Sequence, residues 1–397
     1  MPHHAVLALL ALLFLAFGAA SKPLENGIVT APMLAVALGI LAGPLGSGLV
    51  TLSLDSAVLT VVGELALAIV LFTDASGIAL SGLRGAWRLP TRLLVVGLPL
   101  TVAAGILAGL FCLPQLPFLS LALMACILAP TDAALGVAVV KNELVPQRIR
   151  DSINVESGLN DGLALPPILM LLGLAGAAGG WVPGLGLRDL AVGAVVGLAV
   201  GQIGGRLVEG AWRRGWMDPT YARLASSGLA LLAFSGANLA DGNGFVAAFI
   251  GGLLLAVRDQ GLRERMRAFA EADGTQFTLL VFLLFGLAIL PAAAPLWDLR
   301  QLAYALLSLT LVRMVPVALS LVGAGVDRAG VAFIGWFGPR GIASVLYLTL
   351  MVDELGVAGH ETVVAVVSLT VLLSILAHGA SATPLAAAYG RRQTGSR

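Results

Sequence analysis

Long apolar windows recur along the whole chain, and short polar segments separate them. Most windows reach the roughly 17–25 residues that a helix needs to cross a hydrocarbon core. We therefore predict an all-α polytopic membrane protein with thirteen transmembrane helices, of which the ninth and tenth are short. The predicted spans are Ala5–Ala20, Gly27–Leu45, Ser56–Leu80, Leu93–Leu113, Phe118–Val140, Ser152–Leu174, Leu190–Leu207, Leu224–Ala240, Gly244–Val257, Phe277–Leu290, Leu302–Val322, Val331–Val352 and Val363–Leu385.

The composition supports this interpretation. Hydrophobic residues make up 58% of the chain and charged residues 11%, against about 45–50% and about 25% in soluble domains. We expect one membrane domain, residues 1–397, surrounded by lipid. A net charge of +1 without a basic arm gives no indication of a nucleic-acid partner. Cys112 and Cys126 lack the spacing of a metal site or disulfide framework, and no cofactor is expected.

Basic residues predict the orientation, because Lys and Arg concentrate in cytoplasmic loops. They are frequent after odd-numbered spans, whereas the loops after even-numbered spans hold only Arg188 and Arg300. The N-terminus is therefore predicted outside and the C-terminus inside. As an alternative, Ala5–Ala20 is a cleaved signal peptide ending in small residues, although no Lys or Arg precedes its apolar core.

Two spans carry residues that interrupt a helix. Pro130 lies in the middle of the fifth and Pro339, between Gly338 and Gly341, in the twelfth. Broken helices at corresponding positions of two halves mark transporter sites. An offset of seven spans predicts two inverted six-helix repeats, residues 1–174 and 224–385, joined by a connecting helix at residues 190–207.

Ionisable residues inside these spans indicate a transport function, since a charge at membrane depth is costly unless it has a role. At 1.5 Å per residue, five of them lie roughly 9–15 Å from the predicted cytoplasmic side. Two further acids lie in the spans, Glu156 nearer that side and Glu64 nearer the outer face. The acids inside the spans therefore outnumber the two arginines, and this excess of negative charge attracts cations. The five are Asp74, Asp132, Asp161, Arg313 and Arg340.

Helical phase separates the roles of the acids in the sixth span. Ser157 and Asp161 share a face, whereas Glu156 points about 140° away from Asp161. We assign Asp161 and Ser157 to the ion and Glu156 to an ion pair with an intramembrane arginine, for which Arg340 is favoured. Arg313 then remains for Glu156 or Asp74. At the break, Thr131 and Asp132 offer hard oxygen ligands that suit an alkali cation.

The chain resembles the monovalent cation/proton antiporters of the NhaP kind. The string Glu156-Ser157-Gly158-Leu159-Asn160-Asp161-Gly162 carries the resemblance, with Pro130-Thr131-Asp132 before it and Gly338-Pro339-Arg340-Gly341 after it. Phe72-Thr73-Asp74, Gly242–Phe249 and His378-Gly379 fit the same pattern.

The resemblance implies a homodimer, thirteen helices in inverted repeats, and an elevator-like movement of the crossed, broken helices. It also implies that Asp161 binds the cation or the proton, completed by Ser157, Thr131 and Asp132. Asn160 before Asp161 is similar to the one-for-one exchangers. Asp74 stands where many relatives have glutamate, which leaves open whether it contacts the ion directly or through water.

The sequence thus predicts exchange of Na⁺, Li⁺ or K⁺ for H⁺ at Asp161, in the inner membrane of a prokaryote. The alternative is a sodium-coupled symporter of an organic anion, which would need a cationic substrate site in this net acidic layer. A channel would need a continuous polar pore. Neither a nucleophile with its base nor a phosphate-binding loop is present to indicate an enzyme.

Overall fold

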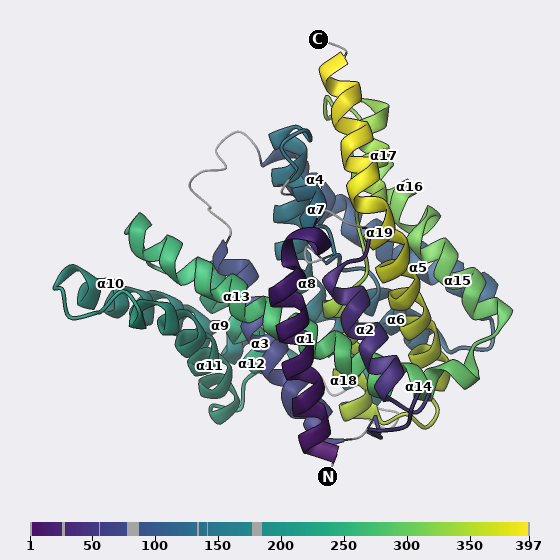
Figure 1. The fold of residues 1–397 in the computed structure, drawn as a ribbon, viewed down its shortest axis with the longest axis horizontal. Helices are drawn as coiled ribbons and strands as arrows, with labels where there is room; N and C mark the ends of the chain where they lie inside the picture. Colours follow the sequence, from purple (N-terminus) through teal and green to yellow (C-terminus); the bar gives the residue numbers. More distant parts are fainter. Residues whose placement is uncertain are drawn as a thin grey trace. The chain divides into compact units, whose positions relative to one another are not determined.

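The computed structural model describes residues 2–25, 28–54, 56–77, 87–132, 135–140, 142–176 and 185–395, and the regular elements in these ranges are all helices (Figure 1). In this part of the chain seven helices are long and apolar enough to cross a membrane: Leu59–Gly77, Arg88–Cys112, Gln147–Gly176, Gly186–Arg213, Gly274–Leu296, Leu299–Ser320 and Glu361–Gln393. Shorter apolar helices lie at Ala8–Ala19, Ala31–Ala42, Phe118–Ile127, Leu224–Leu239 and Gly244–Leu253. The predicted all-α membrane architecture is confirmed, and the count of thirteen spans stays a prediction.

Some helices continue past the apolar windows. The seventh window ends at Leu207, but α10 (Gly205–Arg213) continues to Arg213. Its last turn is closed by an ion pair at i and i+4, with Arg213 Nη2 2.6 Å from Glu209 Oε1, and such pairs stabilise a helix that has already formed. Hydropathy windows therefore mark the apolar part of a helix and miss its polar end.

The chain forms two compact units that interleave in sequence. The first unit contains Met1–Thr60, Leu83–Asn160 and Thr278–Arg397, and the second contains Val61–Gly82 and Asp161–Phe277. The helix α8 (Gln147–Gly176) belongs to the first unit through Asn160 and to the second from Asp161 onward. Likewise α3 (Ala57–Gly77) and α13 (Gln260–Leu284) are each divided between the units.

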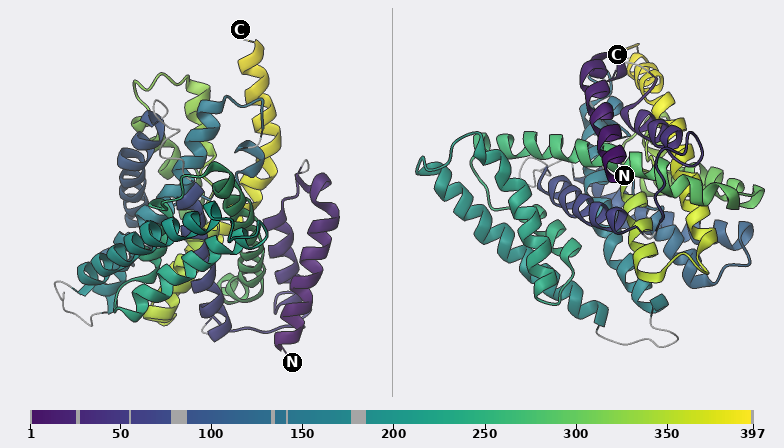
Figure 2. Two further views of the ribbon diagram at one scale, coloured as in Figure 1. Left: turned by 90° about the vertical axis from the view of Figure 1, so that its left-hand side faces the viewer. Right: turned by 60° about the horizontal axis from the view of Figure 1, so that its bottom comes forward.

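The first unit is built from helices near both ends and in the middle of the chain. Here α1 and α2 lie side by side (Figure 2), and α15 packs against the long helix α19. Besides parts of the divided helices, the unit has α1 (Pro2–Glu25), α2 (Ala31–Ala42), α4 (Arg88–Arg92), η1 (Leu93–Gly97), α5 (Leu98–Cys112), α6 (Phe118–Ile127), α7 (Val137–Val140), η4 (Phe285–Ile289), α14 (Leu290–Ala293), η5 (Ala294–Leu296), α15 (Leu299–Leu309), α16 (Leu311–Ser320), α17 (Arg328–Trp336), α18 (Ile342–Leu355) and α19 (Glu361–Gly395).

One apolar core of the first unit joins the start of α4, the start of α8, the end of α16, α17 and the end of α19. At its centre the rings of Phe333 and Tyr389 stack with centroids 4.5 Å apart. Burial of this apolar surface fixes the mutual positions of these helices. The core consists of Leu89, Leu93, Val139, Val145, Ile149, Ile153, Val317, Leu321, Phe333, Ile334, Phe337, Ala382, Ala386 and Tyr389.

The two breaks predicted from the sequence are present. The helix α6 ends at Ile127, and residues 129–132 continue without helical structure. The helix α17 ends at Trp336, and α18 begins only at Ile342. Pro130 and Pro339 contribute to these interruptions, because proline lacks a backbone donor and disfavours helical geometry in the residue before it.

The second unit is held together by close approach of two helices. Three glycines, Gly193, Gly197 and Gly201, recur every four residues along α9 (Leu185–Ala199) and the following η2 (Val200–Gly204). A Cβ atom on any of them would collide with the backbone of α12 (Gly244–Leu253) or of Asn243 just before it. Small residues at this spacing let membrane helices pack with their backbones in contact. Besides α10 and parts of the divided helices, the unit has η3 (Tyr221–Arg223) and α11 (Leu224–Leu239). The helix α11 lies beside both α9 and α12 (Figure 1).

Candidate ion-binding site

The two broken segments of the first unit are hydrogen-bonded to each other. The backbone N–H of Asp132 donates to the carbonyl of Pro339 over 2.8 Å. In return, the N–H of Ile342 donates to Asp132 Oδ2 over 2.7 Å. Ile342 is the first residue of α18, so the Asp132 carboxylate caps this helix and is stabilised by the positive end of its dipole. Asp132 is only 4% exposed.

Arg340, in the second break, binds carbonyl groups of the first break. Its Nη1 donates to the carbonyl oxygens of Ala129 and Pro130, which follow the end of α6. Its backbone N–H donates to Ser374 Oγ on α19 over 2.7 Å. Carbonyls beyond a helix end need donors from elsewhere when they are buried, and a fully buried guanidinium supplies them here.

Glu156 is paired with Arg313. The distances are 2.6 Å from Nη1 to Oε1 and 2.8 Å from Nη2 to Oε2, which is a bidentate geometry between buried side chains. The prediction that Arg340 pairs with Glu156 is therefore wrong, and the alternative partner, Arg313, is correct. Both arginines have similar predicted depths, and sequence reasoning missed the carbonyls at the end of α6, which bind the guanidinium of Arg340.

A buried cluster of hydroxyl and amide groups joins the first break to α8. Thr131 Oγ1 lies 3.0 Å from Ser157 Oγ and accepts a hydrogen bond of 2.7 Å from Asn160 Nδ2. All three residues are at most 3% exposed. Within the described part of the chain, Asn160 Oδ1 is buried without a hydrogen-bond partner. The structure thus brings Thr131, Ser157 and Asn160 together, as predicted for the first two.

The acids Asp161 and Asp74 lie in the second unit, on helices that both pack against α12. Asp161 directly follows Asn160 on α8 and is 4% exposed. Its neighbour Gly162 abuts the ring of Phe249, and Gly252 abuts the backbone of Phe72, two residues before Asp74. Side chains at Gly162 and Gly252 would collide with these groups, so both helices approach α12 closely.

Sequence reasoning missed a polar chain that supports the second break. His378 and Ser374, four residues apart on α19, are fully buried. His378 Nε2 lies 2.9 Å from the carbonyl of Trp336, the last residue of α17. His378 Nδ1 lies 3.0 Å from Ser374 Oγ and 3.1 Å from the carbonyl of Ser374. Polar residues at this spacing share one helix face, and that is the signal that points to them.

Comparison with known proteins identifies the family. The model of the sodium/hydrogen exchanger transmembrane family matches residues 6–388. The chain belongs to this family. Its relatives include the K⁺/H⁺ antiporter NhaP of Alkalimonas amylolytica, with 26% identity over 82% of this chain and 56% of the relative. The K⁺/H⁺ antiporter NhaP2 of Shewanella sp. strain MR-4 is 27% identical over 84% of this chain and 58% of the relative. The Na⁺/H⁺ antiporter of Schizosaccharomyces pombe is 26% identical over 70% and 66%.

A solved structure shows the same fold. The sodium proton antiporter MjNhaP1 from Methanocaldococcus jannaschii superimposes with a TM-score of 0.77, covering 97% of this chain and 99% of that chain at 20% identity. The resemblance to NhaP-type exchangers, first indicated by the Asn160–Asp161 motif, is confirmed. The chain spans somewhat more than half the length of the two NhaP relatives described above.

Proposed function

We propose that this exchanger-family chain moves one monovalent cation against one proton across a membrane, by competition of the two ions at Asp161. The observation that carries the proposal is the hydrogen-bonded cluster of Thr131, Ser157 and Asn160. Asn160 immediately precedes Asp161 on α8. Hydroxyl, amide and carboxylate oxygens are the ligands that alkali cations accept. Thr131 and Asp132 complete the proposed site from the break after α6.

The charges of the first unit support a single exchanging carboxylate. Glu156 is neutralised by Arg313, and Asp132 is engaged with the N-terminus of α18. These two carboxylates therefore have partners that favour a fixed negative charge. We assign the exchange of proton and cation to Asp161, which follows Asn160 on α8, and Asp74 serves as an additional acidic ligand that contacts the ion directly or through water.

Coupling follows from one carboxylate with two mutually exclusive ligands. When Asp161 binds the cation it has lost its proton, and when it is protonated the cation leaves. If only the two occupied forms reorient across the membrane, fluxes of cation and proton run in opposite directions and one for one. The neutral Asn160 beside it contributes no second exchanging charge, which favours electroneutral transport.

The transported ion is proposed to be Na⁺, with Li⁺ or K⁺ as the other members of the class. The relatives described above include both Na⁺/H⁺ and K⁺/H⁺ antiporters. A sodium-coupled symporter of an organic anion finds no support among them.

We extend the proposal to the architecture of the whole chain. Residues 1–174 and 224–385 form inverted six-helix repeats around the connecting helix 190–207. The thirteen helices run from an outer N-terminus to a cytoplasmic C-terminus, and two chains form a homodimer in the inner membrane of a prokaryote.

The test is ion-driven proton flux in proteoliposomes that contain the purified chain. A pH gradient is imposed, and Na⁺, Li⁺ or K⁺ is added in turn while an internal pH dye is followed, with and without a clamped membrane potential. We expect at least one cation to dissipate the gradient at a rate independent of the potential. Failure of all three cations would remove the exchange function, and acceleration by the potential would remove the one-for-one stoichiometry.

A further inference from the structure

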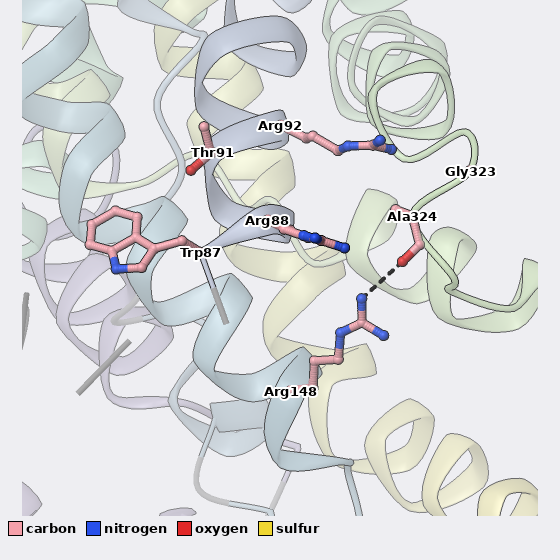
Figure 3. A pocket seen from close by; sticks show the side chains of 7 residues that line it. All are labelled: Trp87, Arg88, Thr91, Arg92, Arg148, Gly323 and Ala324. Carbon is pink, nitrogen blue, oxygen red and sulfur yellow. Dashed lines mark hydrogen bonds between the residues drawn. The ribbon is translucent and has the colours of Figure 1, made fainter. Parts of the chain in front are cut away.

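A basic pocket lies in the first unit, and none of its lining residues belongs to the proposed ion site. It has a volume of about 460 Å³. In Figure 3 the guanidinium groups of Arg88, Arg92 and Arg148 project toward the loop of Gly323 and Ala324, and Trp87 lies on the other side. The lining residues are Trp87, Arg88, Thr91, Arg92, Arg148, Gly323 and Ala324.

The pocket is fixed by the apolar core beneath it. Leu89 and Ile149, the chain neighbours of Arg88 and Arg148, are buried members of that core, as is Leu321 at the end of α16. The three segments that supply the pocket are therefore held together by packing. The positions of the arginine backbones do not depend on a bound partner.

Two of the three arginines are also anchored by the loop. Arg92 Nη1 donates to the carbonyl of Val322 over 2.6 Å. Arg148 Nη2 donates to the carbonyl of Ala324 over 2.8 Å, and its Nη1 to that of Gly325 over 3.3 Å. Gly323 and Gly325 have φ of 70° and 69°, a backbone conformation that residues other than glycine rarely adopt. The loop therefore has a defined shape that presents its carbonyls to the arginines.

The charge in this pocket is unbalanced. Among the described residues, no carboxylate forms an ion pair with Arg88, Arg92 or Arg148. Each guanidinium has five N–H donors, of which the loop carbonyls engage one in Arg92 and two in Arg148. The remaining donors of Arg92 and Arg148 are available to a ligand. All the donors of Arg88 and the hydroxyl of Thr91 are available as well.

We propose that this pocket binds a phosphate-bearing anion. Forked guanidinium donors match phosphate oxygens in geometry as well as in charge. The pocket lies at the ends of helices that are predicted to reach the cytoplasmic face, where acidic phospholipids meet basic residues. Trp87 beside it is a side chain typical of the membrane interface. The phosphate is supplied by an acidic phospholipid headgroup or by soluble phosphate.

The experiment measures lipid binding to the purified full chain by native mass spectrometry, with phosphatidylglycerol and phosphatidylcholine compared at equal concentration. Arg88→Gln removes one donor group that has no partner among the described residues, so folding should be retained. Arg214→Gln, at an exposed position in the second unit, is the control with the same change in charge. We expect phosphatidylglycerol to bind about five-fold more weakly to Arg88→Gln than to the wild type or the control.

Inorganic phosphate added to the same samples separates the two sources. Displacement of phosphatidylglycerol by millimolar phosphate in the wild type, but not in Arg88→Gln, would assign the pocket to soluble phosphate. Retention of the lipid would assign it to the headgroup. Equal binding of phosphatidylglycerol to the wild type, Arg88→Gln and the control would overturn the proposal. These measurements need no transport, so they are independent of the proposed exchange function.

Discussion

Arg313 holds Glu156 through two hydrogen bonds, 2.6 and 2.8 Å long, between side chains that are 2% and 3% exposed. Removing one partner of a buried ion pair leaves a charge without compensation, which costs about 3–5 kcal/mol. We therefore expect Glu156→Gln to lower the free energy of unfolding by this amount. Combining it with Arg313→Met should recover part of the loss, because the stranded cation is removed as well.

Thermal unfolding in detergent measures this coupling as a double-mutant cycle. Arg340→Met serves as the matched control, since Arg340 is equally buried but donates to backbone carbonyls. Its combination with Glu156→Gln should show little recovery. Additive effects of Glu156→Gln and Arg313→Met would contradict the pairing.

The acid at position 161 allows a direct functional prediction. Asp161→Asn keeps the size of the side chain and removes the carboxylate that is proposed to exchange proton and cation. We expect cation-driven proton flux in proteoliposomes to fall to the level of empty liposomes, with normal yield and unfolding temperature. Asp218→Asn, at an exposed position in the second unit, is the control and should leave the flux unchanged. Appreciable exchange by Asp161→Asn would refute its assigned role.

Apolar windows, and two prolines with their neighbouring residues, were sufficient to predict an all-helical membrane chain and both breaks. Proline acts locally, through its missing backbone donor, but Pro316 and Pro384 lie inside continuous helices, so the polar and glycine residues beside Pro130 and Pro339 were needed to single out these two positions. The partner of Glu156 could not be derived in this way. Depth along a helix is a one-dimensional quantity, and Arg313 and Arg340 have similar depths. Only the three-dimensional contacts of the break show that Arg340 is engaged by the carbonyls of Ala129 and Pro130.

His378 illustrates a second limit of sequence reasoning. A lone histidine near the end of an apolar span has no partner in the sequence that would distinguish packing from function. Its bonds to Ser374 and to the carbonyl of Trp336 appear only when α19 is placed against the end of α17. The spacing of Ser374 and His378 gives the face of the helix, whereas tertiary packing decides what that face touches.

Asp132 caps α18 and is also proposed to contribute to the ion site, and one pair of variants distinguishes the two roles. As a cap, it accepts a hydrogen bond from the N–H of Ile342, and an asparagine can accept this bond as well. We expect Asp132→Asn to unfold at nearly the wild-type temperature, and Asp132→Ala to lose about 1 kcal/mol of stability. If its charge also contributes to the ion site, both variants should need more cation for half-maximal exchange. Equal stability of the two variants would exclude the cap.

The two breaks approach each other so closely that Gly341 has no room for a side chain. A Cβ atom at this position would overlap the carboxylate of Asp132, which is itself fixed by its bond to Ile342. The neighbouring backbone cannot shift without losing that bond, so Gly341→Ala should reduce the yield of folded protein and the unfolding temperature. Gly228→Ala on α11, where a Cβ atom has nothing within 4 Å, should have no such effect. Similar behaviour of the two alanine variants would show that the breaks have room to separate.

Thr131 tests whether the polar cluster binds the cation or only holds two segments together. Thr131→Val removes the acceptor of Asn160 Nδ2 and leaves a buried donor unpaired, which costs about 1–3 kcal/mol. Thr131→Ser keeps the hydroxyl and should restore stability.

If Thr131 and Ser157 are cation ligands, Ser157→Ala should raise the cation concentration for half-maximal exchange several-fold while the maximal rate changes little. The measurement is a sodium titration of proton flux at fixed pH. An unchanged half-maximal concentration in Ser157→Ala would restrict the cluster to a structural role, because a hydroxyl that binds the ion cannot be removed without weakening its binding.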